Sequence, residues 1–131
     1  MARSARSINA QRLKDRYLRA TKNDTLCGVS VLNDLAKIAS GSVQQTTGPQ
    51  RVVAYVLCSF LEAVAYDFDE RPVSATEATS FQAQFHQPAL KAAEYLLETD
   101  PEQSDAVSLC EDIIVIHSNN LPMGYCTDAD R

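Results

Sequence analysis

The feature that most constrains the fold is an apolar segment in the middle of the chain, at residues 49–68. Its apolar side chains recur at helical spacing and cover most of the circumference of a helix. A helix of this kind belongs in the interior of a domain. The longest apolar run within it, residues 52–66, is too short to span a membrane and contains Glu62, so we expect a core helix and no membrane span. Its apolar residues are Val52, Val53, Val56, Leu57, Phe60, Leu61, Val64 and Phe68.

Four other segments also have helical periodicity, and their ends carry capping signals. The first covers residues 7–21, with an apolar stripe of Ala10, Leu13, Tyr17 and Ala20. The second begins near residue 25 and ends at a glycine suited to a helix C-terminus. The last two cover residues 75–98 and about 101–118. Five helices with short connections predict an all-α bundle of a single domain, followed by an extended tail at 119–131.

Specific residues define the expected helix boundaries. The expected caps are Asp24 for the second helix and Asp100 for the last. Gly41 is expected at the C-terminus of the second helix. Ser74 and Glu77 form a capping box for the fourth helix, which Pro88 is expected either to kink or to divide into two short abutting helices. The expected buried side of the last helix consists of Val107, Cys110, Ile113, Ile114 and His117.

The charge of the chain is divided sharply. Residues 1–22 hold seven of the twelve lysines and arginines but one of the seventeen acids, whereas residues 23–131 hold five bases and sixteen acids. An acidic surface repels nucleic acids and anionic membranes. A contact with a polyanion therefore requires residues 1–22, which we expect to be a basic amphipathic helix or arm beside a helical core at 23–118.

Three arginines of the basic segment, Arg12, Arg16 and Arg19, share one face of the expected helix. This face can bind an acidic partner protein, contact phosphates, or lie on the acidic core of the same molecule. If the ligand is a nucleic acid, all seven bases of the segment contribute, namely Arg3, Arg6, Arg12, Lys14, Arg16, Arg19 and Lys22.

A narrow polar stripe lies on the apolar segment, with Tyr55, Ser59, Glu62 and Tyr66 at helical spacing. Tyrosine is enriched at protein interfaces because it buries a large area and keeps a polar tip. The stripe is therefore either an exposed seam of the bundle or a surface that binds a partner or a second copy of the chain.

A small enzyme is a second alternative, with Cys58, Cys110, His86 and His117 as the available reactive residues. No Gly-rich phosphate loop and no nucleophile elbow accompanies them. Cys58 also lies in the apolar segment, where burial makes a thiol unreactive. We therefore expect no catalytic residue and no cofactor.

A metal site is not expected either. The chain has no C-x-x-C or H-x-x-x-H spacing, and Cys110 and His117 are separated by about 10.5 Å of helix rise. Three acids near the end of the apolar segment, Asp67, Asp69 and Glu70, lack the spacing of an EF-hand. We expect them to lie in a solvated loop.

No apolar signal region precedes the four cysteines, which indicates a cytoplasmic protein with reduced thiols. The Arg- and Ser-rich start is also typical of an organelle import sequence. The sequence as a whole favours a small non-catalytic protein that binds another protein, as an adaptor, inhibitor or regulatory subunit. The expected partner-binding residues are Arg12, Arg16, Arg19, Tyr55, Ser59, Glu62 and Tyr66.

Overall fold

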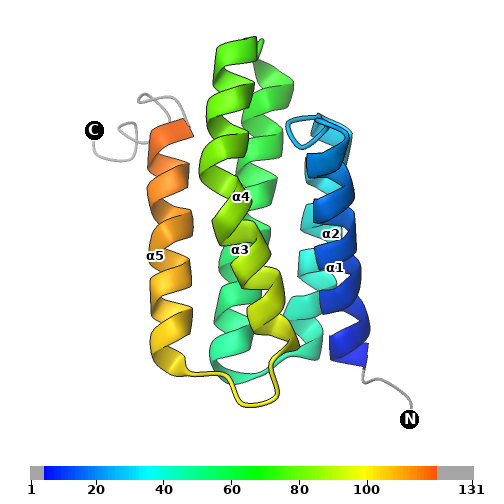
Figure 1. The fold of residues 1–131 in the computed structure, drawn as a ribbon, viewed down its shortest axis with the longest axis vertical. Coiled ribbons are helices and arrows are strands. Elements are labelled where there is room, and N and C mark those ends of the chain that lie inside the picture. The colour runs from blue at the N-terminus through cyan, green and yellow to red at the C-terminus, as the bar shows by residue number, and fades with distance from the viewer. Residues whose placement is uncertain (1–4, 121–131) are drawn as a thin grey trace.

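The computed structural model describes residues 5–120, with side chains from 8 to 119, and these residues form five α-helices (Figure 1). No strand is present within this range, which confirms the predicted all-α bundle. The helices are α1 (Ala5–Lys22), α2 (Val29–Gln45), α3 (Gly48–Glu70), α4 (Ala75–Leu97) and α5 (Gln103–Asn120).

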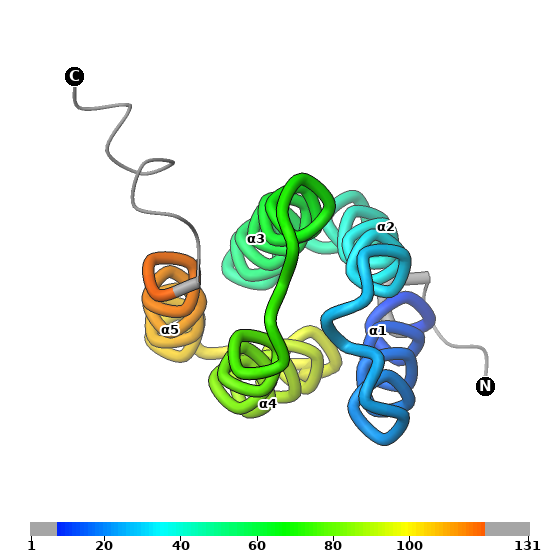
Figure 2. The backbone as a smooth tube through the Cα atoms, turned by 90° about the horizontal axis from the view of Figure 1, so that it is seen from above, coloured from blue at the N-terminus to red at the C-terminus, as the bar shows by residue number. Residues whose placement is uncertain are grey.

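The five helices form a bundle in which α1 and α5 lie at opposite edges (Figure 1). Viewed from above, α3 and α4 face each other, α2 packs between α1 and α3, and α5 packs against α3 and α4 (Figure 2). Pro88 lies inside α4, and the two halves of this helix run in different directions (Figure 2). Because a proline removes one backbone hydrogen bond and crowds the preceding turn, it accounts for such a bend.

The centre of the core is a cluster of aromatic rings contributed by α1, α3 and α4. The rings of Phe60, Phe81 and Phe85 have centroids 5.0 to 6.1 Å apart. Tyr17 of α1 meets Phe85 edge to face at 5.9 Å. The predicted apolar stripe of α1 is therefore part of the same core, and α1 is docked on the bundle along its length.

The connection between α1 and α2 differs from the prediction. Asp24 does not cap α2, since it adopts a positive φ of 55° and the helix begins after Gly28. The Thr25 amide donates to the Ala20 carbonyl, which extends the end of α1 instead of starting α2. Gly41 does not end α2 but lies inside it, where a Cβ would come within 3.0 Å of the Asn9 side chain. Its small size allows α1 and α2 to approach closely.

The corner between α3 and α4 confirms one prediction and corrects another. Ser74 accepts the Glu77 amide, and the Ser74 amide bonds back to the Glu77 carboxylate, as expected of a capping box. The acids at 67–70 form the last turn of α3 and not a solvated loop. Asp67 is buried and pairs at 2.8 Å with Arg71, which also pairs with Glu77. Arg71 thus holds the end of α3 against the start of α4.

The orientation of α5 is the largest difference from the prediction. This helix starts at Gln103 and is not capped by Asp100 as expected. Residues 98–102 form the connection between α4 and α5. Gln50 donates to the carbonyls of Tyr95 and Glu98, and the Tyr95 hydroxyl donates to the Glu102 carbonyl. The side of α5 that faces the core consists of Ala106, Leu109, Ile113 and Ile116.

Candidate functional site

Between α3 and α5, two adjacent hollows of about 530 and 220 Å³ share Ile114. Together they form one open depression, here called the α3/α5 groove. Its floor includes Phe60 and Ile113, which belong to the core. Its walls are Val52, Tyr55 and Val56 on α3, and Val107, Cys110 and Ile114 on α5.

The walls of the groove include large apolar side chains that the sequence predicted to be buried and that lie on the surface. Val52 is 54% exposed, Val107 is 52% exposed and Ile114 is 56% exposed. Helix α5 is rotated about its axis so that Leu109 and Ile116 face the core. Val107 and Ile114 therefore lie outside the core, which corrects the predicted buried side. The prediction that Ile113 is buried is confirmed.

The α3 wall carries part of the polar stripe found in the sequence. Tyr55 and Ser59 are exposed and line the groove. Glu62 and Tyr66 are also exposed but do not line it, and the Glu62 carboxylate accepts from the Cys58 thiol at 3.2 Å. The stripe is thus exposed on α3, and its first two residues lie beside the apolar side of α5.

Charged groups are sparse in the groove and differ between its sides. Glu111 lines it on the α5 side. On the far side of Val52 and Tyr55, Arg51 turns toward α2, and its Nε donates to the Val43 carbonyl at 3.0 Å. His117 lies at one end, 6.1 Å from the Phe60 ring, and burial lowers the pKa of its imidazole. The imidazole is therefore neutral at neutral pH.

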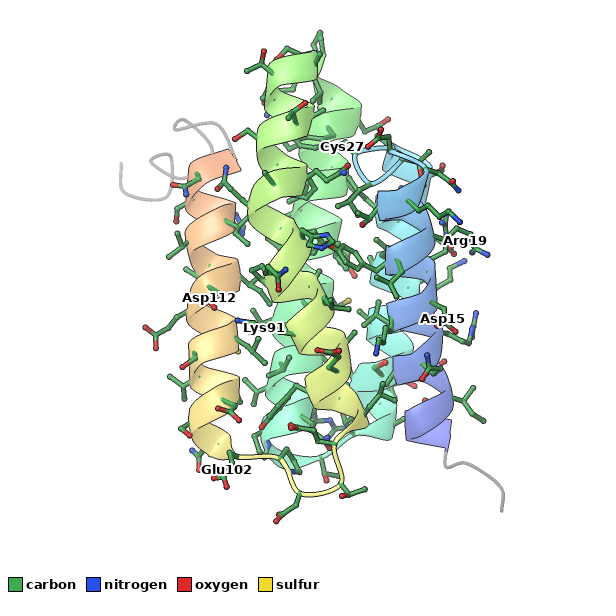
Figure 3. All side chains as sticks on the ribbon, viewed as in Figure 1. Asp15, Arg19, Cys27, Lys91, Glu102 and Asp112 are labelled. Atoms are coloured by element: carbon green, nitrogen blue, oxygen red, sulfur yellow. The ribbon has the colours of Figure 1, made fainter. Side chains whose placement is uncertain are left out.

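The cations of α1 that sequence analysis selected face different directions. Arg16 donates to Asp34 of α2 at 2.8 Å, and Lys14 pairs with Glu94 of α4 at 3.5 Å. Arg12 donates to the Asn9 side-chain oxygen at 3.4 Å. The two labelled residues on the outer side of α1, Asp15 and Arg19, point away from the bundle (Figure 3).

Lys22 is exposed as well, so the outward cations of α1 are Arg12, Arg19 and Lys22. Arg3 lies outside the described residues, and Arg6 lies outside the described side chains. The arginine face of α1 and the stripe of α3 are not brought together, because α2 lies between the two helices (Figure 2). The seven residues expected to bind a partner therefore occupy two separate surfaces.

Among the side chains from 8 to 119, the cysteines and histidines are not arranged as an activated nucleophile. Cys27 and His86 line one hollow between α4 and the α1–α2 connection, a juxtaposition that the sequence did not reveal. The Cys27 thiol donates to the Ala78 carbonyl at 3.3 Å. Burial raises the pKa of Cys27 and of Cys58 to about 11 and also raises that of Cys110. All three thiols are protonated at neutral pH, whereas a nucleophile needs the thiolate.

A polar hollow of about 300 Å³ lies between α4 and α5, on the side of α5 opposite the α3/α5 groove. The Lys91 side chain reaches from α4 toward α5, where Asp112 lies (Figure 3). Three more acids, Glu94, Glu98 and Asp105, line this hollow. Among the described side chains, no three His, Cys, Asp or Glu residues are arranged to hold a metal ion.

Comparison with known proteins adds no relative: no protein-family model, no curated protein and no solved structure matches this chain significantly. Within residues 5–120, none of the helices combines the length and the apolar character needed to cross a membrane.

Proposed function

We propose that this protein is a small non-catalytic helical protein that binds another protein in the α3/α5 groove. The observation that carries the proposal is the pair of exposed apolar walls, formed by Val52 and Tyr55 on one helix and Val107 and Ile114 on the other. Single exposed apolar residues are common on soluble proteins, but a contiguous patch marks an interaction site. A groove between two helices is also a common receptor for a third helix.

The chemistry of the groove supports binding in preference to catalysis. Tyr55 presents a large, rigid ring with a polar tip beside apolar walls, as residues at the centre of an interface do. The reactive groups at its edge, Cys110 and His117, are separated by about 10.5 Å of helix rise, and the Cys110 thiol is protonated at neutral pH. An adaptor, an inhibitor and a regulatory subunit all act by binding another protein.

Two substitutions on adjacent residues of α5 test the proposal. Ile114 lines both hollows, whereas Val115 is equally exposed at 57% and lines neither. The wild type and the variants Ile114→Asp and Val115→Asp serve as immobilised baits for cell extract, and retained proteins are quantified by mass spectrometry. We expect a set of proteins that the wild type and Val115→Asp retain and Ile114→Asp loses. Identical sets from all three baits would contradict docking in the groove.

The outward cations of α1 favour nucleic-acid binding as a second candidate, because Arg12, Arg19 and Lys22 remain exposed while Arg16 and Lys14 pair with acids of α2 and α4. Three phosphate contacts give a slope of about −3 in log affinity against log salt. Binding of a labelled duplex between 25 and 200 mM salt measures this slope. Absence of binding at the lowest salt excludes the candidate.

A further inference from the structure

We propose that the occupant of the α3/α5 groove is an amphipathic helix whose apolar face fills the groove and whose lysines or arginines lie along the α5 edge. This inference rests on the proposed function and adds the chemistry of the partner. Its basis is the charge of the chain around the groove, together with the shape of the walls.

The α5 edge of the groove is acidic beside the larger hollow, at Asp105, Glu111 and Asp112, and residues 113–120 carry no acid. Residues 92–120 contain seven acids and neither a lysine nor an arginine. Glu111 stands on the rim, and Asp105 and Asp112 follow on the outer side of the same helix. A cationic side chain of the partner placed over α5 is therefore attracted by several carboxylates, which favours association and fixes its orientation.

The α3 edge has a different charge. Arg51 lies on the far side of Val52 and Tyr55, with its guanidinium held at the Val43 carbonyl. A cation of the partner on this edge is repelled by Arg51 in the part of the groove nearest Gly48. The basic residues of the partner are therefore expected on one flank of its apolar face and not on both.

The dimensions of the groove suit about three turns of helix. The α5 wall from Val107 to His117 covers ten residue steps, which corresponds to about 15 Å at the rise of an α-helix. Three turns of partner helix supply apolar anchors at positions i, i+4 and i+7. Two of these anchors can fit the larger hollow, and the third can fit the smaller hollow beside Ile114.

A second copy of this chain is a poorer occupant. Antiparallel packing of α5 against α5 places Glu111 and Asp112 of both copies near the symmetry axis. Neither helix carries a lysine or arginine to compensate, so like charges face each other across an apolar contact. A partner with a basic flank avoids this repulsion.

The test uses a phage-displayed library of random 16-residue peptides, panned on the full chain and then depleted on the Ile114→Asp variant. We expect peptides with apolar residues at i, i+4 and i+7, and with lysine or arginine exceeding aspartate and glutamate on one flank. Synthetic copies are expected to bind Val115→Asp at least as tightly as the wild type, because the new carboxylate lies beside Glu111 on α5. Their affinity for Glu111→Lys is expected to fall about fivefold to tenfold.

The outcomes separate the two proposals. If no peptide distinguishes the wild type from Ile114→Asp, docking in the groove is wrong and both proposals fail. If peptides depend on Ile114 but are neutral or acidic on both flanks, the groove binds protein and only the basic partner is wrong. Sedimentation equilibrium of the wild type and of Ile114→Asp tests whether a second copy of the chain occupies the groove. A wild-type dimer that this substitution dissociates would assign the groove to a second copy and overturn the proposal of a basic partner.

Discussion

The two edge helices of the bundle use their apolar residues in different ways. In α1, Ala10, Leu13, Tyr17 and Ala20 form one stripe, and all four are buried. In α5, Ile113 and Ile116 are buried while their neighbours Ile114 and Val115 are exposed. An edge helix with a single stripe has one way to face the core, whereas an edge helix with apolar residues on several sides leaves some of them for another contact.

The same difference distinguishes the arginine face of α1 from the α3/α5 groove as surfaces for a partner. On α1 the apolar stripe is used by the fold, the large apolar side chains left exposed are Ile8 and Leu18, which do not line the α3/α5 groove, and Arg16 is already paired with Asp34. On α5 the fold uses one side and leaves Val107 and Ile114 beside Tyr55 of α3. For this reason we assign the partner to the α3/α5 groove and not to the arginine face.

The largest expected effect is a contrast in stability between the two edges. Leu13→Ala removes a side chain that is 3% exposed and is expected to lower the free energy of unfolding by about 2–5 kcal/mol. Ile114→Ala removes an exposed side chain and introduces a better helix former, so a change within about 0.5 kcal/mol is expected. Urea unfolding measures both, and equal losses would show that α5 also buries this side.

A second expected effect is slow modification of the thiols. In a Cys126→Ser variant, Cys27 and Cys58 are expected to form thiolate about a hundredfold less than a cysteine at its ordinary pKa of 9.0, because burial raises their pKa to about 11. Cys110, on the groove wall, is expected to react fastest of the three. A chromogenic disulfide reagent at pH 7.5 gives the rates. A thiol reacting as in the unfolded chain would favour the enzyme alternative.

A third effect concerns the α3–α4 corner, which lies on neither edge. Arg71→Met leaves the buried Asp67 carboxylate without its pair and is expected to cost about 1–3 kcal/mol. In the wild type, the hydrogen bond and charge of Arg71 hold the pKa of Glu77 below its ordinary 4.5. Glu77 therefore stabilises the fold above pH 4.5 and loses that contribution as pH falls through its lower folded pKa.

Acid titration of stability tests this prediction. Below pH 4.5 the wild type is expected to lose stability more steeply than Arg71→Met, since the variant no longer contains the ion pair. Binding in the groove serves as the control and is expected to be the same in both proteins. Parallel acid titrations would contradict the role given to Arg71.

The smallest expected effect is that of the ion pair between α1 and α2. Arg16→Gln removes a contact of 2.8 Å at a partly exposed site and is expected to cost less than about 1 kcal/mol, with the loss disappearing in 1 M salt. Arg19→Gln is the matched control. Arg19 points outward (Figure 3), so its substitution is expected to leave the stability unchanged. Equal effects of the two variants would mean that the arginines of α1 are not held differently.

Much of the fold could be predicted from the sequence, because its strongest signals are local. Helical spacing gave the five helices, the single stripe of α1 gave its buried side, and Ser74 with Glu77 gave the start of α4. The start of α2 was missed because the Thr25 amide bonds to the end of α1, a competition that composition does not reveal.

The site was less predictable for a related reason. The run from Leu109 to Ile116 has apolar residues on several sides of α5, so periodicity alone does not select the buried side. The selection comes from the 98–102 connection and from packing against α3 and α4, which are properties of the assembled bundle. Tyr55 and Ser59 were identified in the sequence, but the α5 half of the groove appears only in three dimensions.

The central claim is that one apolar side of α5 faces solvent in the free protein. Methyl relaxation enhancement by a soluble paramagnetic probe measures this directly, because only exposed methyl groups relax faster. We expect strong enhancement at Ile114, Val107 and Val52, and weak enhancement at Ile113 and Ile116. Weak enhancement at Ile114 with strong enhancement at Ile116 would mean that α5 is turned the other way, and the groove as described would not exist.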